Sequence, residues 1–548
     1  MSLSQGAIRA TTDVERIEAP VTFKAYMMCA FAAFGGIFFG YDSGYINGVL
    51  GIPYYIHLQT GLPYSLLDDE ATKDQFAIPS WKKSLIVSIL SLGTFLGAII
   101  AGDLADFIGR RTTVIFGCLV FLVGVVLQTA SNSGLGLIIP GRLIAGFGVG
   151  FVSATIILYM SEIAPRKIRG ALVSGYQFCI TIGLLLASCV AYGTQDFTDT
   201  SSYRVPIALQ MLWAIILAIG LFFLPESPRY FVKKGNLERA RGVLARVRGQ
   251  AVDSELIEQE LAEIVANHEY EMQVIPQGSY FSSWANCFKG SLWRPNSNLR
   301  RTILGTSLQM MQQWTGINFI FYFGTTFFQQ LGTIDNPFLI SLITTLVNVL
   351  STPLSFWAIE RFGRRPLLIW GALGMLICEF IVAIAGTVDG DNPHTVKAMI
   401  SFICIYIFFF ATTWGPGAWV IIGEIFPLQI RSRGVGLSTA SNWLWNCIIA
   451  VITPYMVDKQ YGDLKAKVFF IWGGLCILCF FYAYFLIYET KGLSLEQVDK
   501  MMEETTPLTS AHWKATTTFA AEMGLTDKGT LRAEVPQESE KKEPGSVV

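Results

Sequence analysis

An acidic residue lies inside the first long apolar stretch of this chain. Between Ala25 and Leu50 the only charged side chain is that of Asp42. It precedes Leu50 by eight residues, about 12 Å along a helix that rises about 1.5 Å per residue. That depth fits a residue at the headgroup surface poorly. A carboxylate in hydrocarbon must be paired, protonated or in contact with a water-filled cavity, so Asp42 is a candidate functional residue.

An arginine occupies a comparable depth in another apolar stretch. Arg142 lies roughly 8 Å below Leu137, where that stretch begins, and therefore in the same half of the membrane as Asp42. A carboxylate and a guanidinium that pair offset each other's cost of burial, and one proton can switch such a pair. The alternative is that Arg142 extends to the lipid headgroups. Glu379, alone in its stretch, is a weaker candidate because it has no evident partner.

Amide side chains gather on one face of a third apolar stretch. Gln309, Gln312 and Gln313 are spaced i, i+3 and i+4, which places them together on a helix. Sugar hydroxyls both donate and accept hydrogen bonds, and amides do the same without carrying a charge. We expect most of these amides to face one polar cavity, although hydrogen bonding between helices is the alternative for each. Further buried amides are Gln177, Asn318, Asn348, Asn442 and Asn446.

The composition is that of a membrane protein with many spans. Hydrophobic residues make up 52% of the chain and charged residues 15%, against about 25% charged in soluble domains. A net charge of −1 argues against a nucleic-acid partner, and we expect no metal and no cofactor. We predict an all-α fold with twelve transmembrane helices, near residues 25–50, 84–104, 112–130, 138–161, 170–192, 205–224, 303–328, 338–359, 366–387, 397–422, 434–456 and 466–488.

Arginines in alternate short loops predict the orientation. By the positive-inside rule both termini lie in the cytoplasm. The stretch between the sixth and seventh spans is polar, and two apolar stripes in it predict amphipathic helices, the first capped by Asn236. We therefore divide the chain into an N-terminal segment, a six-helix half, a linker with amphipathic helices, a second six-helix half and a mostly disordered tail, at residues 1–24, 25–225, 226–301, 302–490 and 491–548.

The two halves repeat. The segment 162–169 matches 424–431 at an offset of 262 residues, and 106–111 matches 360–365 at an offset of 254. Matches in one order at nearly one offset indicate a duplication, and an offset of six spans keeps both copies on the same side of the membrane. Parallel six-helix repeats are typical of transporters whose halves rock about a site near the midplane.

Four sequence motifs stand out. They are Gly102-x-x-x-Asp106-x-x-Gly109-Arg110-Arg111, Pro225-Glu226-Ser227-Pro228-Arg229, Gln312-Gln313-x-Thr315-Gly316-x-Asn318 and Tyr488-Glu489-Thr490-Lys491-Gly492. Together they resemble the motifs of the sugar porter family of the major facilitator superfamily. The resemblance covers about residues 25–495, and the motif that begins with the glutamine pair is its most specific part. Two departures touch the cytoplasmic side: Tyr488 replaces the usual proline, and the second copy of the first motif has Phe356 in place of glycine and Glu360 in place of aspartate.

The resemblance implies roles for individual residues. In the related symporters, the residues that match Asp42 and Arg142 are the proton acceptor and its partner. The sugar-contacting positions of the family match Gln177, Gln312, Gln313, Asn318, Asn348 and Asn446, with Trp419 as an aromatic floor. Asn442 is added from its place in the eleventh span, and Phe39 or Trp443 could also stack on a sugar.

Charges at the cytoplasmic helix ends suggest a latch. Acid and base groups from opposite halves can pair in one conformation and separate in the other, although setting the topology explains part of them. The candidates for this cytoplasmic gate are Asp106, Arg110, Glu162, Arg166, Glu226, Arg229, Glu360, Arg365, Glu424 and Arg431.

These observations predict a monosaccharide carrier of the plasma membrane. We expect a glucose-type sugar and proton symporter that works by alternating access, is a monomer and has only the sugar, the proton and the lipid bilayer as partners. A facilitative carrier without proton coupling is the nearest alternative. A glucose sensor on the same scaffold is a further alternative, and the stretch of about 55 residues after Gly492 counts against it, because such sensors have long signalling tails. No arrangement of nucleophile and base indicates an enzyme.

Overall fold

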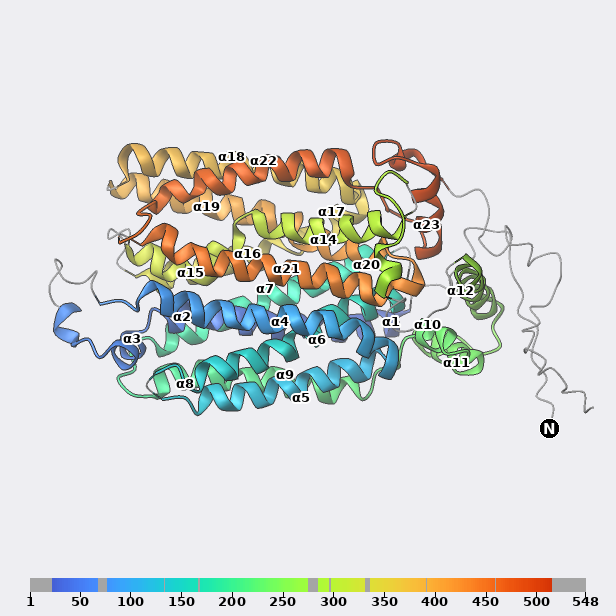
Figure 1. Cartoon of the computed structure of the whole chain (residues 1–548), viewed down its shortest axis with the longest axis horizontal. Coiled ribbons are helices and arrows are strands. Elements are labelled where there is room, and N and C mark those ends of the chain that lie inside the picture. Colours follow the sequence, from blue (N-terminus) through green and yellow to red (C-terminus); the bar gives the residue numbers. More distant parts are fainter. Residues whose placement is uncertain are drawn as a thin grey trace, which may run out of the picture.

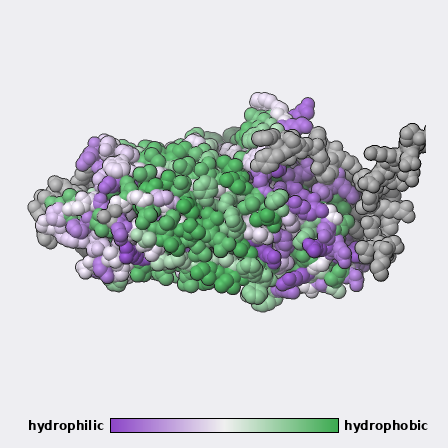
Figure 2. All heavy atoms as spheres, turned by 60° about the horizontal axis from the view of Figure 1, so that its bottom comes forward, coloured by the Kyte–Doolittle hydropathy of each residue, from purple (hydrophilic) through white to green (hydrophobic). Residues whose placement is uncertain are grey.

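The computed structural model describes residues 22–67, 76–132, 134–165, 168–274, 284–294, 297–330, 336–390, 392–458 and 460–514. Within these ranges the chain is helical and has no strand, which confirms the predicted all-α fold. The long helices run side by side along the longest axis of the molecule (Figure 1). Hydrophobic residues form a belt around the middle, with hydrophilic residues at both ends, as a bilayer requires (Figure 2).

The helices before the linker form the first half. Its first and last spans are broken, the first at Phe34 and the last at Leu209, after Pro206 has removed a backbone donor. The helices are α1 (Phe23–Ala33), α2 (Gly35–Val49), α3 (Pro53–Thr60), α4 (Ser80–Ile108), α5 (Arg110–Thr129), α6 (Ile138–Ile163), α7 (Arg169–Thr194), α8 (Ser201–Ala208) and α9 (Gln210–Leu221).

The second half repeats this order with more interruptions. Gly316, at φ +78°, breaks one span, and the bend between α16 and α17 is 43°. The helices are α14 (Asn298–Trp314), α15 (Ile317–Gln330), α16 (Pro337–Ser351), α17 (Leu354–Phe362), α18 (Arg364–Asp389), α19 (Pro393–Thr412), α20 (Trp414–Glu424), α21 (Leu428–Val457) and α22 (Val468–Leu486).

Ten described helices or helix pairs are long and apolar enough to cross a membrane, and the bent pair α16–α17 makes eleven. The sequence predicts twelve. The remaining pair, α14–α15, lies where the seventh span is expected, but it is not apolar enough to be counted. Its first helix carries Arg300, Arg301 and three glutamines, and the break at Gly316 divides it.

Short helices cover one end of the bundle, which we call the linker end (Figure 1). They are α10 (Pro228–Lys233), α11 (Leu237–Arg248) and α12 (Glu255–Val274), and the side chain of Asn236 caps α11 as predicted. The tail differs from the expectation of disorder, since α23 (Leu495–Glu504) packs its apolar face on this end. Ser494 and Gln497 form a capping box at its start. Residues 515–548 lie outside the described residues.

Glycines let helices approach closely inside the first half. A Cβ atom at Gly40 of α2 would lie 2.0 Å from the carbonyl oxygen of Ile180, and one at Gly183 of α7 would lie 2.4 Å from that of Ile37. Close backbone contact through small residues is a main source of helix association in membranes. Between the halves, α4 packs on α21, α2 on α15 and α7 on α16.

We expect Gly40→Ala to destabilise the protein, because its methyl group would collide with backbone that cannot move aside without separating α2 from α7. Overpacking of this kind costs about 1–3 kcal/mol. Gly474→Ala is the matched control, since nothing lies within 4 Å of a Cβ there. Thermal unfolding of the detergent-purified proteins should show a lower midpoint for Gly40→Ala only. Equal midpoints would contradict the close packing.

Candidate functional site

A central cavity lies between the two halves. Its empty volume, the space open to solvent included, is about 520 Å³. Seven of the eight residues expected to contact a sugar line it: Gln177, Gln312, Gln313, Asn318, Trp419, Asn442 and Asn446. The other lining residues are Phe39, Ser43, Ile180, Leu184, Ile317, Phe321, Tyr322 and Phe410.

Two broken spans hold the amide of Gln312. Its Nε2 atom donates to the carbonyl oxygens of Trp414 and Gly415, at 3.1 and 2.9 Å. These carbonyls lie at the start of α20, just after the interruption at Thr413. The Nδ2 atom of Asn442 donates to the Oε1 atoms of Gln312 and Gln309, at 2.8 and 2.7 Å. Backbone carbonyls in the first turn of α20 thus orient the amide of Gln312.

A second group of amides surrounds Gln313. Asn318 donates to its Oε1 atom, and Asn446 does so at 3.4 Å. The amide of Asn446 also donates to the hydroxyl of Tyr322 at 3.0 Å and accepts from Ser91 of the first half at 2.7 Å. Tyr322 is a lining residue that the sequence analysis missed. Its position, four residues after Asn318 on the same helix face, is the signal that could have found it.

Aromatic rings form the less polar walls of the cavity. Trp419 packs edge-on against Tyr176 with ring centroids 5.8 Å apart, and Phe39 lies 4.9 Å from Trp443. Of the two additional rings considered from the sequence, Phe39 lines the cavity. Trp443 is buried behind it.

Asn348 is the expected sugar contact that does not line the cavity. It lies on α16, is fully buried, and neither of its amide atoms has a hydrogen-bond partner among the described residues. Its place in the eighth span is as predicted. The helix α16 packs on α7, and Asn348 is not among the residues that line the cavity in this conformation.

Asp42 is fully buried, and within the described structure neither carboxylate oxygen has a hydrogen-bond partner. The expected ion pair with Arg142 is not formed. Arg142 donates instead to the carbonyl oxygen of Ile86 at 2.6 Å and to the hydroxyl of Tyr45. That hydroxyl donates to Gln128 at 2.7 Å. Tyr45, one turn after Asp42, takes the arginine because its hydroxyl reaches the guanidinium.

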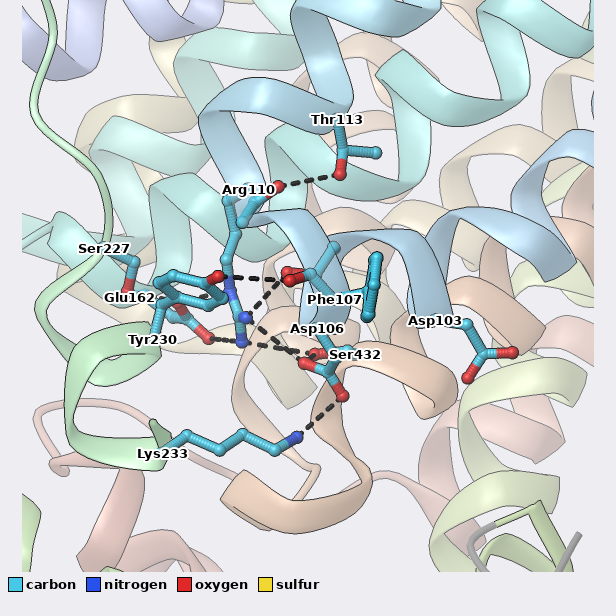
Figure 3. A network of polar contacts seen from close by, with 12 residues as sticks. Asp103, Asp106, Phe107, Arg110, Thr113, Glu162, Ser227, Tyr230, Lys233 and Ser432 are labelled. Atoms are coloured by element: carbon cyan, nitrogen blue, oxygen red, sulfur yellow. Dashed lines mark hydrogen bonds and ion pairs between the residues drawn. The ribbon is translucent and has the colours of Figure 1, made fainter. Parts of the chain in front are cut away.

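At the linker end, Arg110 organises a network of charges (Figure 3). Two of its nitrogens contact the carboxylate of Glu162 at 3.0 and 3.1 Å, and a third contacts Asp106 at 3.2 Å. Lys233 of the linker contacts the second oxygen of Asp106 at 2.7 Å. Glu226 accepts from the backbone N–H groups of Arg110 and Arg111 and so closes the N-terminus of α5.

The second half repeats this network around Arg364. It contacts Glu424 at 3.0 Å and Glu360 at 3.4 Å, and Glu489 accepts from the backbone N–H groups that begin α18. Arg365, the residue named from the sequence, has other contacts. Arg365 donates to the carbonyl oxygen of Tyr484 at 2.7 Å and lies against its ring. The repeat points to Arg364 as the counterpart of Arg110, because an offset of 254 residues maps one onto the other.

The remaining gate candidates differ in their contacts. Arg229 pairs with Glu496 of α23. Arg431 is fully buried but makes only one side-chain hydrogen bond, to the carbonyl oxygen of Phe426 at 2.9 Å, and both of its Nη atoms lack a partner among the described residues. It therefore forms no ion pair in this conformation. Arg166 lies outside the described residues.

Contacts across the two halves close the linker end. The hydroxyl of Ser432 donates to Asp106 at 2.6 Å, and Arg433 contacts Asp103 at 2.7 Å. The backbone N–H of Ala171 donates to Glu360 at 3.0 Å. The carboxylates at the helix ends are thus shared between one half and the other.

Two carboxyl groups at the linker end have pKa values shifted in opposite directions. Burial raises the pKa of Glu226 above its usual range, against the hydrogen bonds from backbone N–H groups. Burial also tends to raise the pKa of Glu496, but the charge of Arg229 outweighs it and lowers the pKa to about 2. Glu496 therefore stays ionised, and the link between linker and tail persists at physiological pH.

We expect Arg364→Ala to lower the stability of the protein far more than Arg365→Ala. The first substitution leaves Glu424 buried without its cation, which typically costs about 3–5 kcal/mol. The second removes only a contact with a carbonyl and a ring at the surface. Comparison of thermal unfolding midpoints tests this directly, and an equal loss for both variants would exclude a central role for Arg364.

Comparisons with known proteins agree with this geometry. The family described as "Sugar (and other) transporter" matches residues 28–502. The major facilitator-type transporter ecdD of Aspergillus rugulosus is 46% identical and covers 90% of each chain. The probable glucose transporter rco-3 of Neurospora crassa is 43% identical, over 87% of this chain and 79% of that one. The high glucose sensor RGT2 of Saccharomyces cerevisiae is 41% identical, over 91% of this chain and 63% of its own length.

A solved structure has the same fold. It is that of the proton:xylose symporter XylE, of the major facilitator superfamily, bound to 6-bromo-6-deoxy-D-glucose. XylE is 25% identical to this chain, and the match has a TM-score of 0.70 over 87% of this chain and 99% of that one. The resemblance inferred from the motifs is thereby confirmed. The chain belongs to the sugar transporter family of the major facilitator superfamily, whose members are transporters and not enzymes.

Proposed function

We propose that the protein is a proton-coupled carrier of glucose-type hexoses that works by alternating access. The observation that carries this proposal is the buried, unpartnered carboxyl of Asp42. It lies one residue from Ser43, which lines the central cavity. A substrate site of uncharged amides next to a single protonatable group is what coupled uptake of a neutral sugar requires.

The sugar binds in the central cavity. Gln177, Gln313 and Asn318 offer donors and acceptors to its hydroxyls, while Gln312 and Asn442 fix the lining from behind through their mutual hydrogen bond. Trp419 supplies a ring for the apolar face of a pyranose. The printed names of rco-3 and of the XylE ligand support a glucose-like substrate.

The proton binds at Asp42. A buried carboxyl without a donor or a cation at hydrogen-bond distance fits the protonated form, and the guanidinium of Arg142 is free to return to it once the proton leaves. One proton that moves down 100 mV yields about 2.3 kcal/mol. At about 1.4 kcal/mol per factor of ten, this can sustain roughly 40-fold accumulation.

Alternation uses the contacts at the two ends of the bundle. At the linker end, which we place in the cytoplasm together with both termini, the networks of Arg110 and Arg364 and the contacts of Ser432 and Arg433 hold the halves together. They must part when the cavity opens inward. The carrier acts as a monomer in the plasma membrane.

A facilitative carrier is the second candidate. The contact between Arg142 and Tyr45 favours it, because the hydroxyl of Tyr45 accepts a hydrogen bond from Arg142 in place of the carboxylate of Asp42. A sensor, favoured by the match to RGT2, would bind sugar without transporting it.

We expect Gln313→Ala to raise the half-saturation concentration for glucose uptake at least tenfold. The substitution removes an amide that lines the cavity and accepts hydrogen bonds from Asn318 and Asn446. Asn348→Ala, at a residue that does not line the cavity, should change it less than threefold. Initial uptake rates of radiolabelled glucose in carrier-deficient cells measure both. A larger effect of Asn348→Ala would relocate the sugar site toward α16.

We expect Asp42→Asn to abolish accumulation of sugar against a gradient while exchange of sugar across the membrane persists, since the amide cannot carry a proton. Glu379→Gln, which alters another fully buried acid, is the control and should still accumulate sugar. Uptake into vesicles with an imposed pH gradient, with and without a protonophore, separates these outcomes. Concentrative uptake by Asp42→Asn would exclude it as the proton site, and protonophore-insensitive uptake by the unmodified protein would favour the facilitator.

A further inference from the structure

A second cavity lies between the halves at the end opposite the linker, which we call the far end. Its empty volume is about 330 Å³. It is separated from the central cavity by α15, because the two cavities take different faces of that helix. The central cavity is lined by Ile317, Asn318, Phe321 and Tyr322 of α15, and the second by Phe319, Phe323, Thr326 and Phe327.

The remaining walls of this far-end cavity come from both halves. From the first half, α4 contributes Ser80 and Lys83, and from the second half α21 and its end contribute Thr453, Pro454, Val457 and Asp458. The hydroxyl of Ser80 donates to the carboxylate of Asp458 and so joins the halves above the cavity. The cavity is therefore polar on one side and aromatic on the other.

A buried group of this cavity lacks a partner. Thr453 is 1% exposed, and its hydroxyl makes no hydrogen bond within the described residues. Buried hydroxyls are nearly always hydrogen-bonded, so one that lines a cavity indicates a ligand or water there. Lys83 is half-buried beside it and interacts electrostatically with Asp458. The two side chains offer donors, and the carboxylate offers acceptors.

We propose that this far-end cavity is a second, weaker monosaccharide site on the path into the carrier. Lys83, Thr453 and Asp458 bind sugar hydroxyls, and the rings of Phe319, Phe323 and Phe327 cover the apolar face of the sugar. Because α15 lines both sites, one on each of two faces, a movement of α15 transfers the sugar from one to the other. The inference rests on the proposed function for its substrate class, and it adds a site to which no role has been given above.

The stripe on α21 supports a continuous path. Asn442 and Asn446 of the central cavity and Thr453 and Val457 of the far-end cavity are spaced by four, seven and four residues, so they follow one face of the helix. The two cavities therefore share one face of α21.

Equilibrium binding of radiolabelled D-glucose to the purified full chain in lipid nanodiscs tests the proposal. We expect two glucose molecules per chain, bound with different affinities. Gln313→Ala should abolish the tighter component only. Thr453→Val, which removes a hydroxyl and keeps the shape, should weaken the other about fivefold, equivalent to about 1 kcal/mol. Lys83→Met should weaken it too, as a second variant in case the first folds poorly.

Thr439→Val is the matched control, because Thr439 also lies on α21 with a buried hydroxyl that lacks a partner in the described structure, yet it lines neither cavity. It should leave both components unchanged. One glucose per chain, lost completely in Gln313→Ala, would overturn the second site and leave the proposed function intact. A weaker component that Thr453→Val and Lys83→Met do not change would also overturn it. Neither binding nor uptake by the unmodified chain would instead refute the proposed function.

Discussion

A polar group in hydrocarbon cannot form hydrogen bonds with water, so it must find a partner within the protein. This constraint explains most of what is unusual in the structure. Gln312 donates to the carbonyl oxygens of Trp414 and Gly415 at the start of α20. The amides of Asn442 and Asn446 donate in turn to side chains of α14 and α15. These amides thus form a connected set of donors and acceptors.

The same constraint separates the arginines into two kinds. Arg110 and Arg364 are buried and compensated by carboxylates from their own half, so they hold helix ends together. Arg142 is compensated by a hydroxyl and a carbonyl, which are neutral. A charge held by neutral dipoles is easier to redirect than one held by an opposite charge. The arginine nearest Asp42 is therefore also the one most free to change its partner.

The sequence was sufficient for the architecture and for most of the cavity. Long apolar stretches and the duplicated loop segments indicated the helices and their order, and the spacing of Gln309, Gln312 and Gln313 indicated their shared face. It failed where the answer depended on the direction of one side chain. Adjacent arginines such as Arg364 and Arg365 point to opposite sides of a helix start. Likewise, Asn348 lies in the expected span but does not line the cavity, and its position in the sequence does not decide this.

Two other differences come from contacts that are distant in sequence. The hydroxyl of Tyr45 accepts a hydrogen bond from Arg142, which lies 97 residues later in the sequence. The tail helix α23 is ordered because its apolar face finds the base of the bundle, although its composition resembles that of a solvated segment. Local patterns carry no information about such partners, so the helix in the described part of the tail could not be read from the sequence.

Glu226 and Glu489 each reach back from the end of a six-helix half to cap the helix that begins its third span. Each half is thereby tied into a ring, with its last segment fastened to its early part. A ring of this kind resists internal shear, so deformation is directed to the seam between the two rings. Relative movement of the two halves is consequently expected at this seam, and substitutions that remove either cap would let the half concerned deform internally.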